Sequence, residues 1–362
     1  MDGGRRQVQL PDLQIPSFSE VADGGRQDAG NSTKTLVFVQ RTKAKSGNTN
    51  CALSAPLFAY FAVCPGKVGQ TLTLQEPVMF SEESIPLTDQ QVHEVLVDVL
   101  ALHGYDFTNY SPPSIRRRIA RLIVNDRFDS FDAFHSRLRN DKEYFRRFLE
   151  QITVSATEMF RDTSFYRTLR EKVLPLLGPP PIRIWHAGCS TGEEVYSMAI
   201  ILEELGLLNN TELYATDINP AVLSSVKEGA YPLANMKQYS DNYLQSGGAS
   251  TLRNYYNIEG DVARFNPALS RNMIVSRHNL VSDAPFRKWH LIMCRNVLIY
   301  FDRSLQERVL KIFVESLEPG GFLALGSKET IRFSGVEKDF RVITRDEKIW
   351  RKASITNSKS PR

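Results

Sequence analysis

Small residues, glycines and two glutamates follow one another in residues 187–194 (AGCSTGEE), after an apolar segment. Glycine lets the backbone approach a ligand closely, and the first turn of a following helix offers free N–H groups. The segment has neither the GxGxxG nor the GxxxxGK[ST] spacing of nucleotide-binding loops. Its glutamates repel phosphate and attract a cationic amino group. The segment therefore favours S-adenosylmethionine, which carries ammonium and sulfonium groups, over a dinucleotide, with a tight structural turn as the alternative.

Polar residues also follow two other apolar segments. Asp217 comes after residues 212–216, a position where an acidic side chain commonly accepts hydrogen bonds from a ribose diol. A helix cap is the alternative interpretation of Asp217. Arg295 and Asn296 follow residues 291–294, at the strand end where open α/β sheets bind ligands. A structural ion pair is the alternative for Arg295.

A fourth segment, residues 153–161 (TVSATEMFR), clusters Ser155, Thr157 and Arg161. These side chains can cover a ligand from above, and a helix cap with a linker is the alternative. The chain has no Ser-His-Asp pattern, and its four cysteines show no metal-ligand spacing. We therefore expect no metal and a reducing compartment.

The elements that must position these residues alternate along the chain. Apolar segments at 182–187, 212–216, 291–294 and 321–325 are predicted strands, and segments 193–205, 220–227 and 305–317 are predicted helices. This alternation predicts a doubly wound α/β sheet with parallel strands. Residues 237–275 interrupt the alternation, which indicates an inserted subdomain.

The chain before this sheet has a helical pattern. Apolar spacing predicts helices over residues 89–103, 114–125, 130–140 and 142–153. The second of these carries four arginines around its apolar face: Arg116, Arg117, Arg118 and Arg121. They can steer an acidic partner electrostatically, and a solvated helix face is the alternative.

Composition bounds the remaining possibilities. The chain has 362 residues and a net charge of +4, which is too weak to indicate nucleic-acid binding by itself. It has no apolar run long enough to cross a bilayer, so we expect a cytoplasmic protein without membrane insertion. Residues 1–85 lack a pattern and are predicted to be partly disordered, as is the tail 353–362. Because no methionine lies between Met1 and Met79, we hypothesise that translation starts near Met79.

Five segments together resemble the CheR family of chemotaxis receptor methyltransferases. They are TVSATEMFRD (153–162), WHAGCSTGEEVYSMAI (185–200), ATDIN (215–219), HNL (278–280) and CRNVLIYFD (294–302). The resemblance implies a Rossmann-like class I methyltransferase sheet at 161–352, an all-helical domain at 86–160, and a small inserted antiparallel β-subdomain at about 237–275.

The resemblance also implies roles for single residues. The cofactor-contacting set would be Ser155, Thr157, Arg161, Gly188, Glu194, Asp217, Asn279, Leu280, Arg295 and Asn296. Asp217 would hold the ribose, Glu194 would lie beside the methionine or adenosine part, and Asn279 with Leu280 would flank the adenine. Arg161 and Tyr300 would lie nearest the transferred methyl group.

Two segments depart from the family pattern. Ser155 stands where the family usually has asparagine. The insert, at residues 255–261 (YYNIEGD), is shorter than the hairpin of members that dock on a receptor's C-terminal peptide, so we do not expect that mode of docking.

The implied reaction is methyl transfer from S-adenosylmethionine to glutamate carboxylates of methyl-accepting chemoreceptors, which leaves S-adenosylhomocysteine. Such a carboxylate, with a pKa of about 4.3, is already ionised and needs no strong base. The partner would be a glutamate-rich helical bundle, met by Arg116, Arg117, Arg118 and Arg121. We expect a monomer. We also expect no nucleic-acid binding, because CRNV stands where nucleic-acid amino methyltransferases have an Asn/Asp-Pro-Pro-aromatic turn. The alternative is a non-catalytic scaffold or sensor that binds S-adenosylmethionine.

Overall fold

The structure is a computed structural model that describes residues 87–153 and 157–354. The predictions for residues 1–85, for Ser155 and for all but the first two residues of the tail lie outside the described residues. The helices are α1 (Asp89–His103), α2 (Pro112–Asn125), α3 (Phe131–Asn140), α4 (Lys142–Ile152), α5 (Thr163–Thr168), α6 (Glu193–Glu204), α7 (Pro220–Glu228), α8 (Met236–Gln245) and α9 (Arg303–Ser316). The strands are β1 (Ile182–Ala187), β2 (Thr211–Asp217), β3 (Ala230–Pro232), β4 (Tyr256–Glu259), β5 (Val262–Phe265), β6 (Met273–Arg277), β7 (Trp289–Cys294), β8 (Leu317–Leu325), β9 (Phe340–Thr344) and β10 (Ile349–Lys352).

Helices α1–α4 form a separate hydrophobic core, in which Val95, Ile119 and Phe148 are fully buried. Helix α1 begins with a reciprocal capping box between Thr88 and Gln91, which satisfies two N–H groups that a helix start would otherwise leave unpaired. All four helices lie where their apolar periodicity predicted them, so this prediction is confirmed.

The main sheet has seven strands in the order β6-β2-β1-β7-β8-β10-β9. Strands β6, β2, β1, β7 and β8 are parallel, whereas β10 runs antiparallel to both β8 and β9. The predicted doubly wound α/β sheet is confirmed. The closing antiparallel pair β9 and β10 had not been predicted, because both strands are short and carry charged residues.

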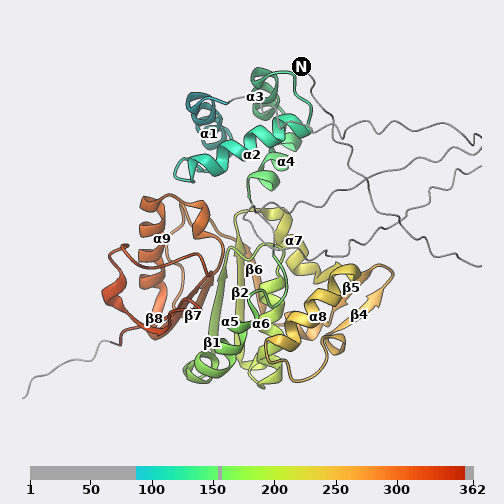
Figure 1. Ribbon diagram of the computed structural model, residues 1–362, viewed down its shortest axis with the longest axis vertical. Helices are drawn as coiled ribbons and strands as arrows, with labels where there is room; N and C mark the ends of the chain where they lie inside the picture. Colours follow the sequence, from blue (N-terminus) through green and yellow to red (C-terminus); the bar gives the residue numbers. More distant parts are fainter. Residues whose placement is uncertain (1–86, 154–156, 355–362) are drawn as a thin grey trace, which may run out of the picture. The chain divides into compact units, whose positions relative to one another are not determined.

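Strand β1 is buried on both faces, which explains its nearly continuous apolar sequence. Successive side chains of a strand point to opposite faces, so Ile184 enters one core and Trp185 the other. Helix α6 belongs to the first of these cores and α9 to the second, and Figure 1 shows the two helices on opposite sides of the strands. Because these strands are parallel, the loops that follow them leave the sheet at the same edge, the carboxyl edge.

A small antiparallel sheet, β3-β5-β4, interrupts the main fold as predicted. The predicted boundaries of 237–275 are corrected at both ends. The small sheet already begins at Ala230, because the three-residue strand β3 is too short to show alternation. Residues 273–275 belong to β6 of the main sheet, an edge strand whose partly exposed residues lack a strong apolar pattern.

Within the described residues, no helix combines the length and apolar character needed to cross a bilayer.

Candidate active site

A cleft opens at the carboxyl ends of β1, β2 and β7. Its empty volume is about 1020 Å³, open solvent included. The predicted site residues that line it are Thr157, Arg161, Gly188, Glu194, Asp217, Asn279, Leu280, Arg295, Asn296 and Tyr300. Ser155 lies outside the described residues. Segments far apart in the sequence thus converge on one cavity, as expected for the carboxyl edge of a parallel sheet.

The loop after β1 depends on a glycine. Gly188 has a φ of +80°, and a Cβ atom there would lie 2.5 Å from Cγ2 of Val297 in the loop after β7. The N–H groups of Gly188 and Cys189 both donate to the carbonyl oxygen of Thr216 in β2, at 2.8 and 2.9 Å. The absence of a side chain therefore lets the loops after β1 and β7 come together at the bottom of the cleft.

Asp217, the last residue of β2, is held by backbone N–H groups. Its carboxylate accepts from the N–H of Ser190 and from the N–H of Asn219, each at 3.0 Å. Burial raises the pKa of Asp217, although these hydrogen bonds lower it. The interpretation of Asp217 as the helix cap is wrong, because the side chain of Asn219 caps α7. Each carboxylate oxygen keeps a further lone pair for a ligand hydroxyl.

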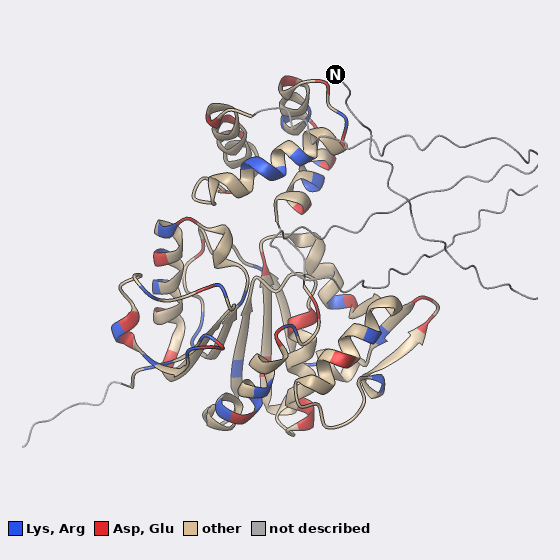
Figure 2. Cartoon of the chain, viewed as in Figure 1, with Lys and Arg blue, Asp and Glu red and all other residues tan. Residues whose placement is uncertain are grey.

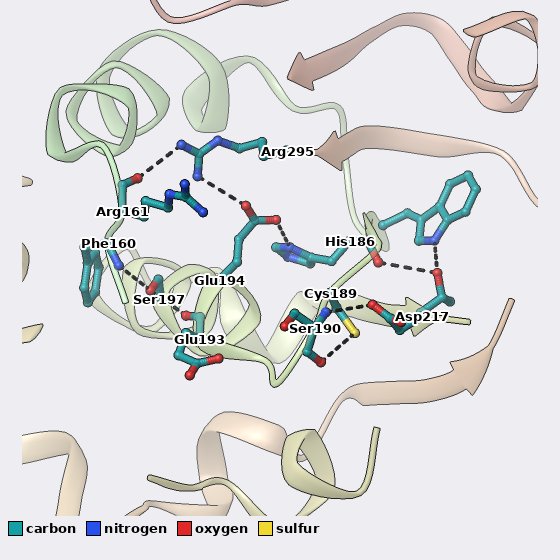
Figure 3. Close-up of polar contacts among 12 residues, drawn as sticks. Phe160, Arg161, His186, Cys189, Ser190, Glu193, Glu194, Ser197, Asp217 and Arg295 are labelled. Atoms are coloured by element: carbon teal, nitrogen blue, oxygen red, sulfur yellow. Dashed lines mark hydrogen bonds and ion pairs between the residues drawn. The ribbon is translucent and has the colours of Figure 1, made fainter. Parts of the chain in front are cut away.

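Arg295 joins three elements around the cleft (Figure 3). Its guanidinium donates to Glu194 at 3.2 Å, to Asp162 at 2.6 Å and to the carbonyl oxygen of Arg161 at 3.1 Å. It also lies over the ring of Phe165, 4.0 Å from the ring centroid. Burial lowers the pKa of Arg295, but the nearby acidic groups, Glu194 foremost, more than compensate and raise it. The structural ion pair proposed as an alternative is therefore present, and it lies inside the site.

Glu194 lies between two possible cations, His186 of β1 and Arg295. His186 Nδ1 is 2.9 Å from one carboxylate oxygen of Glu194, and Arg295 contacts the other. Burial raises the pKa of Glu194, but the hydrogen bond and charge of His186 and the charge of Arg295 outweigh burial and lower it. Glu194 is therefore ionised at neutral pH and places a negative charge in the cleft.

Arg161 stands between two residues with left-handed backbone conformations. Phe160 has a φ of +53° and Asp162 a φ of +62°, which is uncommon for residues other than glycine. The N–H of Phe160 donates to Ser197 Oγ at 2.9 Å, and Ser197 donates in turn to the carbonyl of Glu193 at 2.6 Å. Figure 3 shows the Arg161 side chain beside Arg295 and Glu194. Such strained segments gather at functional sites, where the surroundings fix them.

Tyr300 closes the cleft from the loop after β7, and the helical part contacts it. The Arg118 guanidinium lies 5.1 Å from the centroid of the Tyr300 ring and donates to the carbonyl of Ile152 at 2.9 Å. The predicted group of four partner-facing arginines therefore divides. Arg118 contacts the ring of Tyr300, Arg116 pairs with Asp89 while its side chain stays partly exposed, and Arg117 and Arg121 are exposed. Figure 2 shows the basic residues along α2.

Two residues of the site had not been predicted. Glu329 is 4% exposed, and its carboxylate accepts from the N–H groups of Gly326, Asn296, Val297 and Ile299 at 2.6 to 3.3 Å. It thereby holds the loop that leads to Tyr300. Tyr110, from the loop before α2, lines the cleft and forms an isolated β-bridge with Phe301. An acidic residue soon after the 321–325 strand was the only available signal for Glu329, and nothing in the sequence distinguished Tyr110.

Among residues 87–153 and 157–354, no three His, Cys, Asp or Glu side chains come together in a way that could hold a metal ion. The carboxylates that do converge on the cleft suit an organic ligand rather than a metal ion. Glu194 offers an anionic oxygen to an ammonium group, and Asp217 offers oxygens to a diol. These groups fit S-adenosylmethionine by their chemistry.

Comparison with known proteins agrees with this fit. Residues 155–349 match the S-adenosylmethionine-binding domain of CheR methyltransferases, and residues 93–153 match their all-alpha domain. Cher3 of Pseudomonas putida is 41% identical over 267 residues, which cover 74% of this chain and 98% of Cher3. The chemotaxis protein methyltransferase of Listeria monocytogenes is 31% identical over 63% of this chain and 85% of its own. That of Salmonella typhimurium is 29% identical over 75% of this chain and 92% of its own.

The chain belongs to the CheR methyltransferase family. It is an S-adenosylmethionine-dependent methyltransferase, and together with the sheet order this confirms the predicted class I methyltransferase fold.

Proposed function

We propose that the chain transfers the methyl group of S-adenosylmethionine to glutamate side chains of chemoreceptors and so forms glutamate methyl esters. The observation that carries this proposal is that Arg161 and Tyr300 line the same cleft as the acidic pair Glu194 and Asp217. A cationic side chain and a phenol can both bind a carboxylate, so this pair supports a carboxylate acceptor. The names of two relatives, both chemotaxis protein methyltransferases, support the choice of acceptor.

Within this proposal, the cleft residues bind the cofactor. Asp217 holds the ribose hydroxyls, Glu194 lies beside the methionine or adenosine part, and Asn279 with Leu280 flanks the adenine. The set is completed by Ser155, Thr157, Arg161, Gly188, Arg295 and Asn296. When bound, S-adenosylmethionine supplies an activated methyl group on a sulfonium.

The remaining task of the protein is alignment. The acceptor carboxylate is ionised at neutral pH and needs no general base. Arg161 orients this carboxylate, and Tyr300, fixed by Arg118 across its ring, positions one of its oxygens. Holding two reactants in the productive geometry can supply on the order of 7–11 kcal/mol of the barrier.

The test is incubation of the protein with methyl-labelled S-adenosylmethionine and membranes that carry chemoreceptors of the same organism. Base treatment of the labelled receptor should release volatile labelled methanol, the mark of an ester. Arg161→Ala should cut turnover strongly with the fold intact, and Asp217→Ala should weaken cofactor binding. Absence of label despite cofactor binding would favour another acceptor, or the non-catalytic scaffold.

A further inference from the structure

A second pocket opens on the carboxyl edge of the main sheet, beyond β8. It lies between the segment after β8 and the turn that joins β9 to β10, and we call it the β8–β10 pocket. Its empty volume is about 1080 Å³, open solvent included. Four basic side chains line it: Lys328, Arg332, Arg345 and Lys348.

Two acidic residues also line the pocket, Glu329 and Glu337, and neither forms a salt bridge with these cations. The Glu329 carboxylate accepts hydrogen bonds from four backbone N–H groups. Backbone N–H groups, first that of Glu337 itself and then those of Phe333, Ser334 and Gly335, lower the pKa of the Glu337 carboxylate. Within the described part of the chain, none of the four cations forms a salt bridge at N···O distances up to 4.0 Å. The pocket lining therefore carries four cations against two carboxylates, and no cation is paired with a carboxylate of the described residues.

Apolar side chains lie beside this charge. Phe340 and Trp350 are buried in the pocket wall, and Val342 is half exposed. Phe333, in the same segment as Arg332, is 75% exposed, the most exposed large apolar residue in the described part of the chain. An occupant that fits this surface carries both carboxylates and apolar groups.

The pocket is joined to the loop that carries Tyr300. Glu329 lies in the pocket wall, while its carboxylate holds the N–H groups of Asn296, Val297 and Ile299. Arg303, just after that loop, donates to the carbonyl oxygen of Phe333 at 3.1 Å. Glu329 and Arg303 therefore connect the wall of the pocket directly to the segment that carries Tyr300.

We infer that the β8–β10 pocket docks an acidic helical segment of the methyl acceptor, beside the glutamate that receives the methyl group. The inference rests on the proposed function, since it takes the acceptor to be a glutamate-rich protein. A single small anion would need donors that converge on one point. Here the four cations are divided between residues 328–332 and 345–348 around a wide opening, which suits a row of carboxylates. Complementary charge of this kind governs the rate and register of docking.

The experiment compares the double variant Arg332→Glu/Lys348→Glu with the control Lys172→Glu/Arg271→Glu. The control reverses two exposed basic residues that line neither pocket. Each variant is assayed for methylation of a soluble cytoplasmic fragment of a chemoreceptor, for binding of the same fragment labelled with fluorescein, and for binding of S-adenosylhomocysteine. The pocket variant should raise the KM for the fragment about tenfold and weaken fragment binding to match, with kcat and S-adenosylhomocysteine binding unchanged. The control should behave as wild type.

Equal KM and equal fragment binding in the pocket and control variants would overturn the inference. So would wild-type protein that does not bind the fragment. A pocket variant that loses binding to phosphatidylglycerol vesicles but keeps fragment binding would assign the site to a lipid surface and also overturn it. Fragment binding is measured without cofactor, so a protein that binds the fragment but does not methylate it contradicts the proposed function while still testing the pocket.

Discussion

Glu329 shows how a single residue can hold an active-site loop without touching the reactants. Four N–H groups from two loops donate to its carboxylate, and burial raises its pKa despite these bonds. A buried carboxylate is tolerated only where hydrogen bonds replace its hydration. The side chain therefore fixes the backbone conformation of Asn296, whose φ is +62°.

We expect Glu329→Gln to lower both stability and turnover. Glutamine has nearly the same shape, but one oxygen is replaced by an NH₂ group, which cannot accept the N–H bonds made at that position. Leaving such donors unpaired costs about 1–3 kcal/mol. Chemical denaturation and kcat measurements check this, with Glu315→Gln on an exposed helix position as the matched control. A variant with wild-type stability and kcat would show that the loop after β7 keeps its conformation without the Glu329 carboxylate.

Asp217 is expected to make cofactor binding depend on pH. Its raised pKa means that protonation begins above its ordinary value of 3.8 as pH falls. The protonated acid accepts fewer hydrogen bonds, so the affinity for S-adenosylmethionine should fall with pH through that window. Calorimetric titration across pH checks this, and in Asp217→Asn the affinity should be weaker and the dependence smaller.

Stability should respond to Asp217 in the opposite sense. A raised folded-state pKa means that the folded protein binds more protons than the unfolded chain, so the unfolding free energy attributed to Asp217 falls as pH rises through the same window. Asp217→Asn should remove this pH dependence, and it should also be less stable than wild type at neutral pH by about 1–3 kcal/mol, because its NH₂ group cannot accept the N–H bond of Ser190 or of Asn219 made at that position. An unfolding free energy that keeps the wild-type pH dependence in Asp217→Asn would show that another group is responsible for it.

At the scale of elements, the strongest sequence patterns gave the right structure and the weakest ones failed. Strand β1 and the four amphipathic helices were predictable because burial on one or both faces demands a regular apolar pattern. Strands β3, β6, β9 and β10 were missed. Strand β3 has only three residues, β6 is a partly exposed edge strand, and β9 and β10 are short and carry basic residues. These strands form by pairing with other strands, and a local sequence pattern does not predict such pairing.

The contact between the loops after β1 and β7 can be tested through Gly188. We expect Gly188→Ala to destabilise the protein by about 1 kcal/mol or more, because alanine is strained at a positive φ and its Cβ would meet Val297. The double variant Gly188→Ala/Val297→Ala should recover part of this loss, since only the clash is removed. Thermal unfolding of the four proteins of the cycle measures the coupling, and strict additivity would contradict the contact.

Helix α2 supports a prediction on association. Arg117 and Arg121 are its exposed arginines, whereas Arg118 contacts the ring of Tyr300. We expect Arg117→Glu/Arg121→Glu to slow receptor methylation and to flatten its dependence on salt, because long-range attraction is screened by ions. Initial rates across ionic strength check this, with Lys172→Glu/Arg271→Glu as the matched control. Wild-type kinetics at every salt concentration would refute steering by α2.

At the scale of the whole chain, the cleft is shared between the helical part and the sheet. The N–H of Ser111 donates to the carbonyl of Tyr300 at 2.8 Å, and Asn219 Nδ2 donates to Thr153 Oγ1 at 3.1 Å. Family motifs could predict most of the residues that line this cleft, because each motif follows a recognisable strand or helix. They could not predict Tyr110 or Glu329, whose importance depends on contacts between distant segments.

The dependence of the Tyr300 loop on Glu329 also bears on biosynthesis. A ribosome adds residues in order, at roughly 5–20 per second, and domains begin to fold as they emerge. The core of α1–α4 and the β1 loop are complete well before Glu329 and the β9–β10 pair have left the exit tunnel. Until then the N–H groups of Asn296, Val297 and Ile299 lack their acceptor. A nascent chain can thus fold its helical part before the Tyr300 loop has the contacts that hold it in its folded conformation.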